Sequence, residues 1–300
     1  MAAAEVRVAI DRPALLGEGP AWHPGQQALW YCDIPARRLH RFHPASGAMA
    51  EWEFHTDVGS FAPMPDGRFV VALRDGLWCF DPASDERTRL AVAPYDMSEE
   101  RFNDGKCDPA GRFWVGSMDE PRRPGRASLF CFEGGRLERR QGGVTISNGL
   151  AWSPDARTMY WTDTTAHTVW AFDFDVASGA MSGRRVFAQF PPRPAAGLAG
   201  YGGRPDGAAV DAEGCYWVAM FEGGRVLRLS PQGETIAEVR MPARCPTMPC
   251  FGGADLKTVF VTSASLNRSA DDPAEFPRPG CTFSFRVDAP GLPVDFAAMA

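Results

Sequence analysis

Short alternating runs of apolar and polar residues follow one another along the chain, and related phrases recur. Each phrase is a run of small or apolar residues, a turn rich in Pro, Asp, Ala or Gly, and a second run of aromatic and β-branched residues. This pattern predicts two antiparallel strands joined by a tight turn. Alignment gives six phrases: EGPAWHPGQQALWYCD, GSFAPMPDGRFVVAL, NDGKCDPAGRFWVGSM, NGLAWSPDARTMYWTD, DGAAVDAEGCYWVAM and MPCFGGADLKTVFVTS.

The spacing of the phrases predicts the fold. Their first residues lie 41, 44, 45, 58 and 42 residues apart, and the long interval contains the Gly/Pro/Ala-rich insert 191–203. A third strand is expected after most phrases, at 38–44, 76–82, 169–175 and 225–231. Four antiparallel strands per ~42 residues is typical of a propeller blade. A strand at 5–11 would complete the last blade. Residues 1–300 are therefore predicted to form a single all-β domain, a six-bladed β-propeller, since a β-sandwich does not predict a six-fold period.

The first residue of each phrase occupies an equivalent position on the innermost strand of its blade and should face the central channel. Four of the six are types that strands disfavour: Glu18, Asn103, Asn148 and Asp206. Any one of them could cap a turn, but the shared position in four blades favours convergence on the channel. Two carboxylates there need a compensating charge, which a divalent cation bound by oxygen atoms supplies. Ca²⁺ is expected first, with Mg²⁺, Mn²⁺ or Zn²⁺ as alternatives, although a set without His or Cys is not typical of zinc.

Composition excludes several classes of function. A chain with 45% hydrophobic and 23% charged residues is typical of a soluble globular protein. The net charge of −6 provides no basic field for nucleic acid or an anionic membrane, and no apolar run reaches the ~20 residues of a membrane span. The N-terminus lacks a signal-peptide pattern, and the eight cysteines form no C-x-x-C pair, which favours buried thiols in the cytoplasm. We expect a monomer or weak homodimer with a small-molecule ligand.

The phrases resemble, in order from about residue 16 to residue 283, the senescence-marker-protein/gluconolactonase family of sugar lactonases, which includes regucalcin. The motifs that carry the resemblance are LGEGPAWHP, RFNDGKCDPAGRFWVGSM, ISNGLAWSPD, PDGAAVDAEGCYWVA and CFGGADLKTVFVT. It implies a six-bladed propeller with one divalent metal at the channel mouth, held by Glu18, Asn148 and Asp206. It also implies that Arg101 and Asn103 hydrogen-bond the sugar.

The implied activity is the hydrolysis of an aldonolactone to the aldonic acid, with the metal polarising the lactone carbonyl. Asp206 is expected to act as general base as well as ligand, with Glu18 as the alternative base. Asn148 is excluded because an amide does not accept a proton at neutral pH. Arg101 has a donor fork that suits sugar hydroxyls or a carboxylate, and an exposed loop arginine is the alternative.

Two loops depart from the family pattern. Some relatives carry a substrate-contacting glutamate after the aromatic strand of the third blade, where this chain reads SMDEPRRP. Asp119 and Glu120 both qualify, and Glu120 is preferred. The insert 191–203 leads directly to Asp206, and it is expected to be either a lid or specificity loop or a surface excursion.

Two other functions share some of these features. A non-catalytic calcium-binding regulator of the regucalcin type would use the same metal ligands, but it would not need Arg101, Asn103 or Glu120. An interaction scaffold would need neither the aligned carboxylates nor the RFNDG phrase. The sequence does not distinguish among gluconolactone, arabinonolactone and xylonolactone as substrates.

Overall fold

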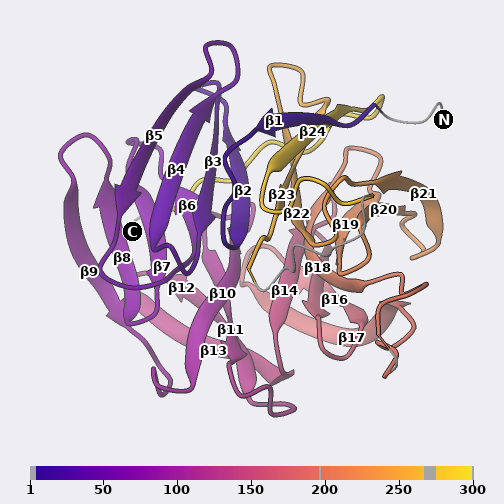
Figure 1. The fold of residues 1–300 in the computed structure, drawn as a ribbon. Helices are drawn as coiled ribbons and strands as arrows, with labels where there is room; N and C mark the ends of the chain where they lie inside the picture. Colours follow the sequence, from indigo (N-terminus) through magenta and orange to yellow (C-terminus); the bar gives the residue numbers. More distant parts are fainter. Residues whose placement is uncertain (1–4, 196, 267–274, 299–300) are drawn as a thin grey trace.

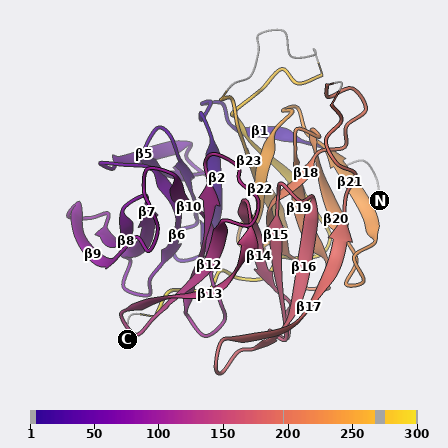
Figure 2. The ribbon, with the colours of Figure 1, turned by 90° about the horizontal axis from the view of Figure 1, so that it is seen from below.

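The computed structural model describes residues 5–195, 197–266 and 275–298. These residues contain 24 strands and no helix, arranged as six four-stranded antiparallel sheets around a central channel (Figures 1 and 2). The predicted all-β fold, a six-bladed β-propeller, is confirmed.

Each blade contains four strands, which follow one another from the channel outward. The first two blades are β2 (Gly17–His23), β3 (Ala28–Asp33), β4 (Arg38–His43) and β5 (Ala48–Glu53), then β6 (Val58–Pro63), β7 (Phe69–Leu73), β8 (Gly76–Asp81) and β9 (Glu86–Val92). The next two are β10 (Glu100–Cys107), β11 (Phe113–Asp119), β12 (Ala127–Glu133) and β13 (Arg136–Val144), then β14 (Ser147–Trp152), β15 (Thr158–Asp163), β16 (Thr168–Asp175) and β17 (Ala180–Gln189). The last two are β18 (Arg204–Val210), β19 (Tyr216–Phe221), β20 (Arg225–Leu229) and β21 (Thr235–Arg240), then β22 (Pro246–Gly252), β23 (Thr258–Ser263), β24 (Thr282–Arg286) and β1 (Arg7–Ile10).

The ring is closed by the first strand of the chain. β1 pairs antiparallel with β24, with Val8 opposite Phe283, and Figure 1 shows the indigo β1 beside the yellow β24. The strand predicted at 5–11 therefore completes the sixth blade. The third strands predicted after the phrases are β4, β8, β16 and β20.

The core lies between the blades, and adjacent residues of a middle strand show how it forms. Trp161 packs with Trp114 of the third blade, whereas Tyr160 packs with Tyr216 of the fifth blade at a ring-centroid distance of 5.0 Å. Side chains alternate between the faces of a strand, so β15 contributes one aromatic ring to each neighbouring blade. This explains why the second run of each phrase is apolar on both faces.

The six inner strands, β2, β6, β10, β14, β18 and β22, contact one another around the channel. Near the start of its strand, Asn148 bonds to Asp206. Farther along, Lys106 of β10 bonds to the Ala208 carbonyl of β18 at 2.8 Å. The inner strands therefore run in the same direction, and their first residues meet at one mouth of the channel.

All eight cysteines are buried and none forms a disulfide, as the sequence predicts. In the described part of the chain, no helix is long and apolar enough to cross a membrane.

Candidate functional site at one mouth of the channel

Three of the predicted channel residues form a hydrogen-bonded chain at this mouth. Asn103 donates from Nδ2 to Oδ1 of Asn148 (2.9 Å), and Asn148 donates from Nδ2 to Oδ1 of Asp206 (2.5 Å). Asn148 also donates to the hydroxyl of Thr164 (2.8 Å). The three predicted side chains are buried. Residues from the third, fourth and fifth blades therefore converge here.

Glu18 joins the group from the first blade. Its side chain is buried, and the negative charges of Asp206 and Asp104 act on it. The two carboxylates predicted as metal ligands therefore lie within electrostatic range of each other.

A β-bulge helps to aim two of these side chains into the channel. The pairing of β2 with β3 shifts register between Glu18 and Ala21, and the residue after Glu18 is Gly19, with φ of 56°. β14 repeats the arrangement, because Asn148 is followed by Gly149 with φ of 61°. Glycine adopts this left-handed conformation without the steric cost that other residues meet. This backbone conformation explains why a glycine follows both Glu18 in GEG and Asn148 in SNG.

The two buried carboxylates, Glu18 and Asp206, make few direct contacts, although the charge of Arg101 acts on both at longer range. Within the described ranges, neither Glu18 nor Asp206 forms an ion pair, and Glu18 accepts one hydrogen bond, from the Gly19 backbone at 3.3 Å. Burial, followed by the charges of Asp206 and Asp104, raises the pKa of Glu18 well above its usual range. Burial likewise raises the pKa of Asp206 to about 8. Negative charge in this position is costly unless a cation accompanies it.

The donor set fits a hard divalent cation. No group of three or more His, Cys, Asp and Glu side chains in the described residues could hold a metal ion. The candidate set therefore has to include an amide, and it consists of Glu18, Asp206 and Asn148. Oxygen donors of this kind suit Ca²⁺, Mg²⁺ or Mn²⁺ better than Zn²⁺. The buried charge of the two carboxylates matches that of one divalent ion.

Arg101 is a buried residue of the mouth and not an exposed loop arginine. Its Nη1 donates to Oδ1 of Asn103 (2.8 Å) and to the carbonyl of Phe102 (2.9 Å). Within the described residues these bonds use one guanidinium nitrogen. Nε and Nη2 of Arg101 form no hydrogen bond with a described residue.

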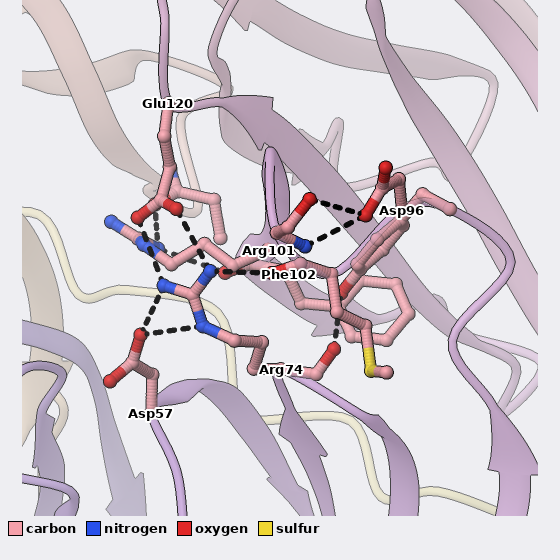
Figure 3. A network of polar contacts seen from close by, with 10 residues as sticks. Asp57, Arg74, Asp96, Arg101, Phe102 and Glu120 are labelled. Atoms are coloured by element: carbon pink, nitrogen blue, oxygen red, sulfur yellow. Dashed lines mark hydrogen bonds and ion pairs between the residues drawn. The ribbon is translucent and has the colours of Figure 1, made fainter.

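Glu120 lies beside Arg101, and its carboxylate is already paired with an arginine. Arg74 donates to both of its carboxylate oxygens, at 2.8 and 2.9 Å, and also binds Asp57 (Figure 3). Arg101 lies beside this group, and its charge and that of Glu120 act on each other.

Asp119, the other residue of this loop that the sequence offered for substrate binding, is instead bonded within the protein. Its side chain is fully buried and accepts hydrogen bonds from the backbone and guanidinium of Arg123. Asp119 thus fixes the turn that follows β11 and carries Glu120.

Sequence reasoning missed Asp104. Its Oδ2 accepts the backbone N–H of Leu150 at 3.0 Å, while its Oδ1 is buried without a hydrogen-bond partner in the described residues. The NDG triplet is typical of a turn, which concealed a residue that belongs to the channel.

Arg204 and Arg122 were also missed. Arg204 opens β18 two residues before Asp206, but the pairing of β18 with β19 shifts register between Pro205 and Ala208, so simple alternation along the strand does not place the two side chains. Arg122 lies in the irregular loop after β11, where no periodicity exists. The charges of both arginines act on Asp206.

The insert 191–203 packs against this mouth in its last residues. Tyr201 is buried, its hydroxyl lies 2.6 Å from Nε2 of His167, and Arg225 donates to the carbonyl of Gly202 at 2.9 Å. This end of the insert is therefore anchored to the fourth and fifth blades.

A cavity of about 270 Å³ occupies the channel beyond the bulges. It is lined by apolar residues of the inner strands and by Leu292 near the C-terminus, with Lys106 and Asp295 among its polar groups. None of the predicted site residues lines it, so the geometry of the side chains, and not cavity size, identifies the candidate site.

The chain is similar to known proteins along most of its length. A family model described as the SMP-30/gluconolactonase/LRE-like region matches residues 16–265. The chain is 42% identical to a 6-deoxy-6-sulfogluconolactonase of Pseudomonas putida, over 95% of this chain and 96% of that protein. It is 35% identical to regucalcin of Danio rerio, over 94% of each. The solved structure of a calcium-binding protein, regucalcin, from Agrobacterium tumefaciens matches over 100% of both chains, with a TM-score of 0.92 and 29% identity.

Proposed function

The chain belongs to the SMP-30/gluconolactonase/LRE-like family of sugar lactonases, and from this premise we propose that it hydrolyses an aldonolactone with the help of one divalent cation. The observation that carries the proposal is the pair of buried carboxylates, Glu18 and Asp206, which have no ion-pair partner in the described residues. Asn148 completes the ligand set. Ca²⁺ is the cation expected first, and Zn²⁺, Mn²⁺ and Mg²⁺ remain alternatives.

Asp206 is proposed as the general base. It takes a proton from the attacking water as the new C–O bond forms at the lactone carbonyl carbon. It returns the proton to the ring oxygen as the ring C–O bond breaks, which leaves the open-chain hydroxy acid. When bound, the cation supplies Lewis-acid polarisation of the carbonyl. A millionfold acceleration requires about 8 kcal/mol, which polarisation and one base can supply.

Arg101 and Asn103 are proposed to bind the sugar. Arg101 presents guanidinium N–H groups that the protein leaves unused, and Asn103 is held by Arg101 and Asn148. Glu120 is the third substrate-binding residue that we propose, in exchange with its partner Arg74. A metal buffer would not need these groups, which favours an enzyme.

The candidate substrates are gluconolactone, arabinonolactone and xylonolactone, together with a sulfonated gluconolactone. The last is included because a relative at 42% identity is a 6-deoxy-6-sulfogluconolactonase. These molecules share the lactone ring and differ in length, hydroxyl configuration and charge, so the surroundings of the ring decide among them.

The alternative function is that of a non-catalytic calcium-binding regulator. It is favoured by the similarity to a calcium-binding regucalcin across the whole chain. The two functions share Glu18, Asn148 and Asp206, and only a test for turnover separates them.

The first experiment is a pH-indicator assay on a panel of these lactones, with chelated protein alone and after addition of Ca²⁺, Mg²⁺, Mn²⁺ or Zn²⁺. We expect no turnover without metal and restored turnover on at least one lactone with it. If metal binds but no lactone is hydrolysed, the enzymatic proposal is wrong.

The role of Asp206 is tested with Asp206→Asn, which keeps the size of the side chain and removes the basic group. We expect kcat to fall by at least ~10²-fold, with an unchanged β-type circular dichroism spectrum. The matched control is Asp173→Asn, because Asp173 is an exposed residue of β16 paired with Arg185. Retained turnover in Asp206→Asn would move the role of base to Glu18.

A further inference from the structure

A second pocket, of about 230 Å³, lies beside the segment that connects β1 to β2. Residues 12–15 of that segment line one side, and residues of β3, of β4 and of the turn between them line the other. We call it the closure pocket, because it lies next to the strand that closes the ring. None of the residues proposed for metal or sugar binding lines it, so it is a separate site.

The closure pocket lies on the face of the propeller that carries the proposed metal site. Asp33, which lines the pocket, is paired with Gly17 across β2 and β3, and Glu18 is the next residue of β2. The carboxylate of Asp33 also accepts the backbone N–H groups of Leu15 (2.8 Å) and Leu16 (3.1 Å). Asp33 therefore holds the segment that leads into β2 against the pocket.

His40 is a buried residue of this pocket, and neither nitrogen of its ring forms a hydrogen bond with a described residue. It is 4% exposed, and its Nδ1 is fully buried. Oε2 of Glu51 lies 3.6 Å from Nδ1, which is beyond hydrogen-bond distance. The ring stacks on Tyr31 at a centroid distance of 4.8 Å. Buried polar groups without a partner are uncommon in folded proteins, so the ring calls for a ligand or an ordered water molecule.

The ring of His40 is neutral at pH 7. Burial lowers the pKa of His40 to about 4, although the charge of Glu51 opposes this shift. A neutral imidazole offers one N–H donor and one acceptor nitrogen. The hydroxyl of Tyr31, which also lines the pocket, forms no hydrogen bond in the described part of the chain. The two stacked rings therefore supply uncharged polar groups that no protein group satisfies.

Arg38 lacks a hydrogen-bonded acceptor. Its Nη1 lies 3.7 Å from Glu51 and its Nη2 lies 3.5 Å from Glu53, so these contacts are ion pairs without hydrogen bonds. Both glutamates have another partner, because Arg12 lies 2.8 Å from Glu51 and Arg37 lies 3.4 Å from Glu53. Three guanidinium groups thus share two carboxylates, and the donor fork of Arg38 is not filled by a described residue.

The polar groups that line the pocket are mostly donors. The two guanidinium groups, the phenol and the imidazole can each donate a hydrogen bond. The carboxylate among them, Asp33, has both oxygens bonded to backbone N–H groups. Guanidinium groups bind phosphate and carboxylate oxygens in pairs, which favours an oxyanion. The volume of about 230 Å³ is below the ~300–1,000 Å³ of sites for drug-sized ligands, so a small ligand fits best.

We propose that the closure pocket is a binding site for a small oxyanion, either a phosphate group or the carboxylate of a sugar acid. Arg12 and Arg38 supply the charged hydrogen-bond donors, and His40 and Tyr31 supply uncharged ones from buried positions. The bound anion lies against the segment that leads into β2. The site is separate from the channel mouth, so this inference does not rest on the proposed lactonase function.

The test is calorimetric titration of the full chain with inorganic phosphate and, separately, with gluconate, each at constant ionic strength. We expect at least one of them to bind with a Kd below ~1 mM and more weakly as ionic strength rises. Arg38→Gln should raise that Kd by ~10-fold or more, because hydrogen bonds to charged groups are the stronger ones. His40→Phe keeps a ring on Tyr31 and removes both nitrogens, and it should raise Kd by ~3- to 10-fold. Binding of phosphate alone identifies a phosphate site, and binding of gluconate alone identifies a carboxylate site.

The matched control is Arg37→Gln. Arg37 is adjacent in the chain and is ion-paired with Glu53, but it does not line the pocket, so its loss should leave Kd nearly unchanged. Equal losses of affinity in Arg37→Gln and Arg38→Gln would mean that the anion responds to general surface charge, which overturns the site. Failure of both anions to bind overturns it as well. So does binding that neither Arg38→Gln nor His40→Phe weakens, which would place gluconate at the channel mouth instead. If either variant does not fold, the other still decides.

Discussion

The two asparagines, Asn103 and Asn148, make the hydrogen-bonded chain of the site continuous, which carboxylates alone could not do. An amide both donates and accepts, so Asn103 accepts from Arg101 and donates to Asn148, which in turn donates to Asp206. These hydrogen bonds therefore connect the proposed sugar-binding arginine to the proposed base and restrict the orientation of each side chain. An aspartate at position 103 would accept from Arg101 but repel the oxygen of Asn148.

The first prediction concerns this chain of amides. Asn103→Ala removes the acceptor for Arg101 and should raise KM for the lactone by ~10-fold or more. Its effect on metal affinity should be smaller than that of Asn148→Ala, which removes a proposed ligand. Initial-rate kinetics and calorimetric titration with Ca²⁺ measure the two effects. Equal losses of metal affinity in the two variants would make Asn103 a ligand.

At the residue scale, the sequence predicted the polar positions that repeat and missed those that do not. Glu18, Asn103, Asn148 and Asp206 share one place in a six-fold repeat, so a period revealed them without any knowledge of distances. Arg122 lies in an irregular loop, and its position relative to Asp206 depends on how the blades are arranged around the channel. No local pattern encodes that packing.

In two of the blades, the hairpin between the first two strands is closed by a buried aspartate, which the sequence alone would identify only as a turn residue. In the fifth blade, Asp211 accepts the indole N–H of Trp217 (2.9 Å) and Nε of Arg228 (2.8 Å), and its side chain is fully buried. In the third blade, Asp108 makes the same bond to Trp114. The aspartate thus fixes the tryptophan whose ring packs between blades.

The second prediction tests the contribution of this buried aspartate to stability. Asp211→Ala leaves the indole N–H and the guanidinium of Arg228 without their acceptor, and we expect it to lower the free energy of unfolding by about 3–5 kcal/mol. Asp155→Ala is the matched control, since Asp155 is an exposed aspartate in the corresponding turn of the fourth blade. Urea denaturation measures both. If the two variants lose similar stability, the buried aspartate has no special role.

The sequence predicted the first three strands of most blades and not the fourth individually. Outer strands such as β9 (ERTRLAV) are mostly exposed or half-buried and carry several charges. Charged edge strands resist pairing with other chains, which is a reason for their composition. It also removes the alternation that identifies a strand with one buried face. The period of the repeat revealed that a fourth strand was required.

On the scale of the whole molecule, the parts that hold the fold together are separate from the residues that we propose as metal ligands. The apolar clusters lie between blades, and β1 closes the ring on β24. The proposed ligands lie on strand starts at one mouth. Metal binding should therefore stabilise the native protein by mass action without being required for folding.

The last prediction follows from that separation. Chelation should abolish activity and lower Tm by on the order of 5 °C, since a ligand at 100 times its Kd contributes about 2.7 kcal/mol, and the β-type circular dichroism spectrum should persist. Global unfolding by the chelator would contradict the separation of core and site.

Glu18→Gln sharpens the same experiment. This variant removes one buried negative charge, and its effect on Tm should change sign with the metal. In the metal-loaded protein it weakens the ligand set and should lower Tm. In the chelated protein it relieves the unpaired charge beside Asp206 and should raise Tm or leave it unchanged. Scanning calorimetry of both proteins with and without Ca²⁺ gives all four values. If Glu18→Gln lowers Tm equally with and without Ca²⁺, then Glu18 supports the fold and is not a ligand of the cation.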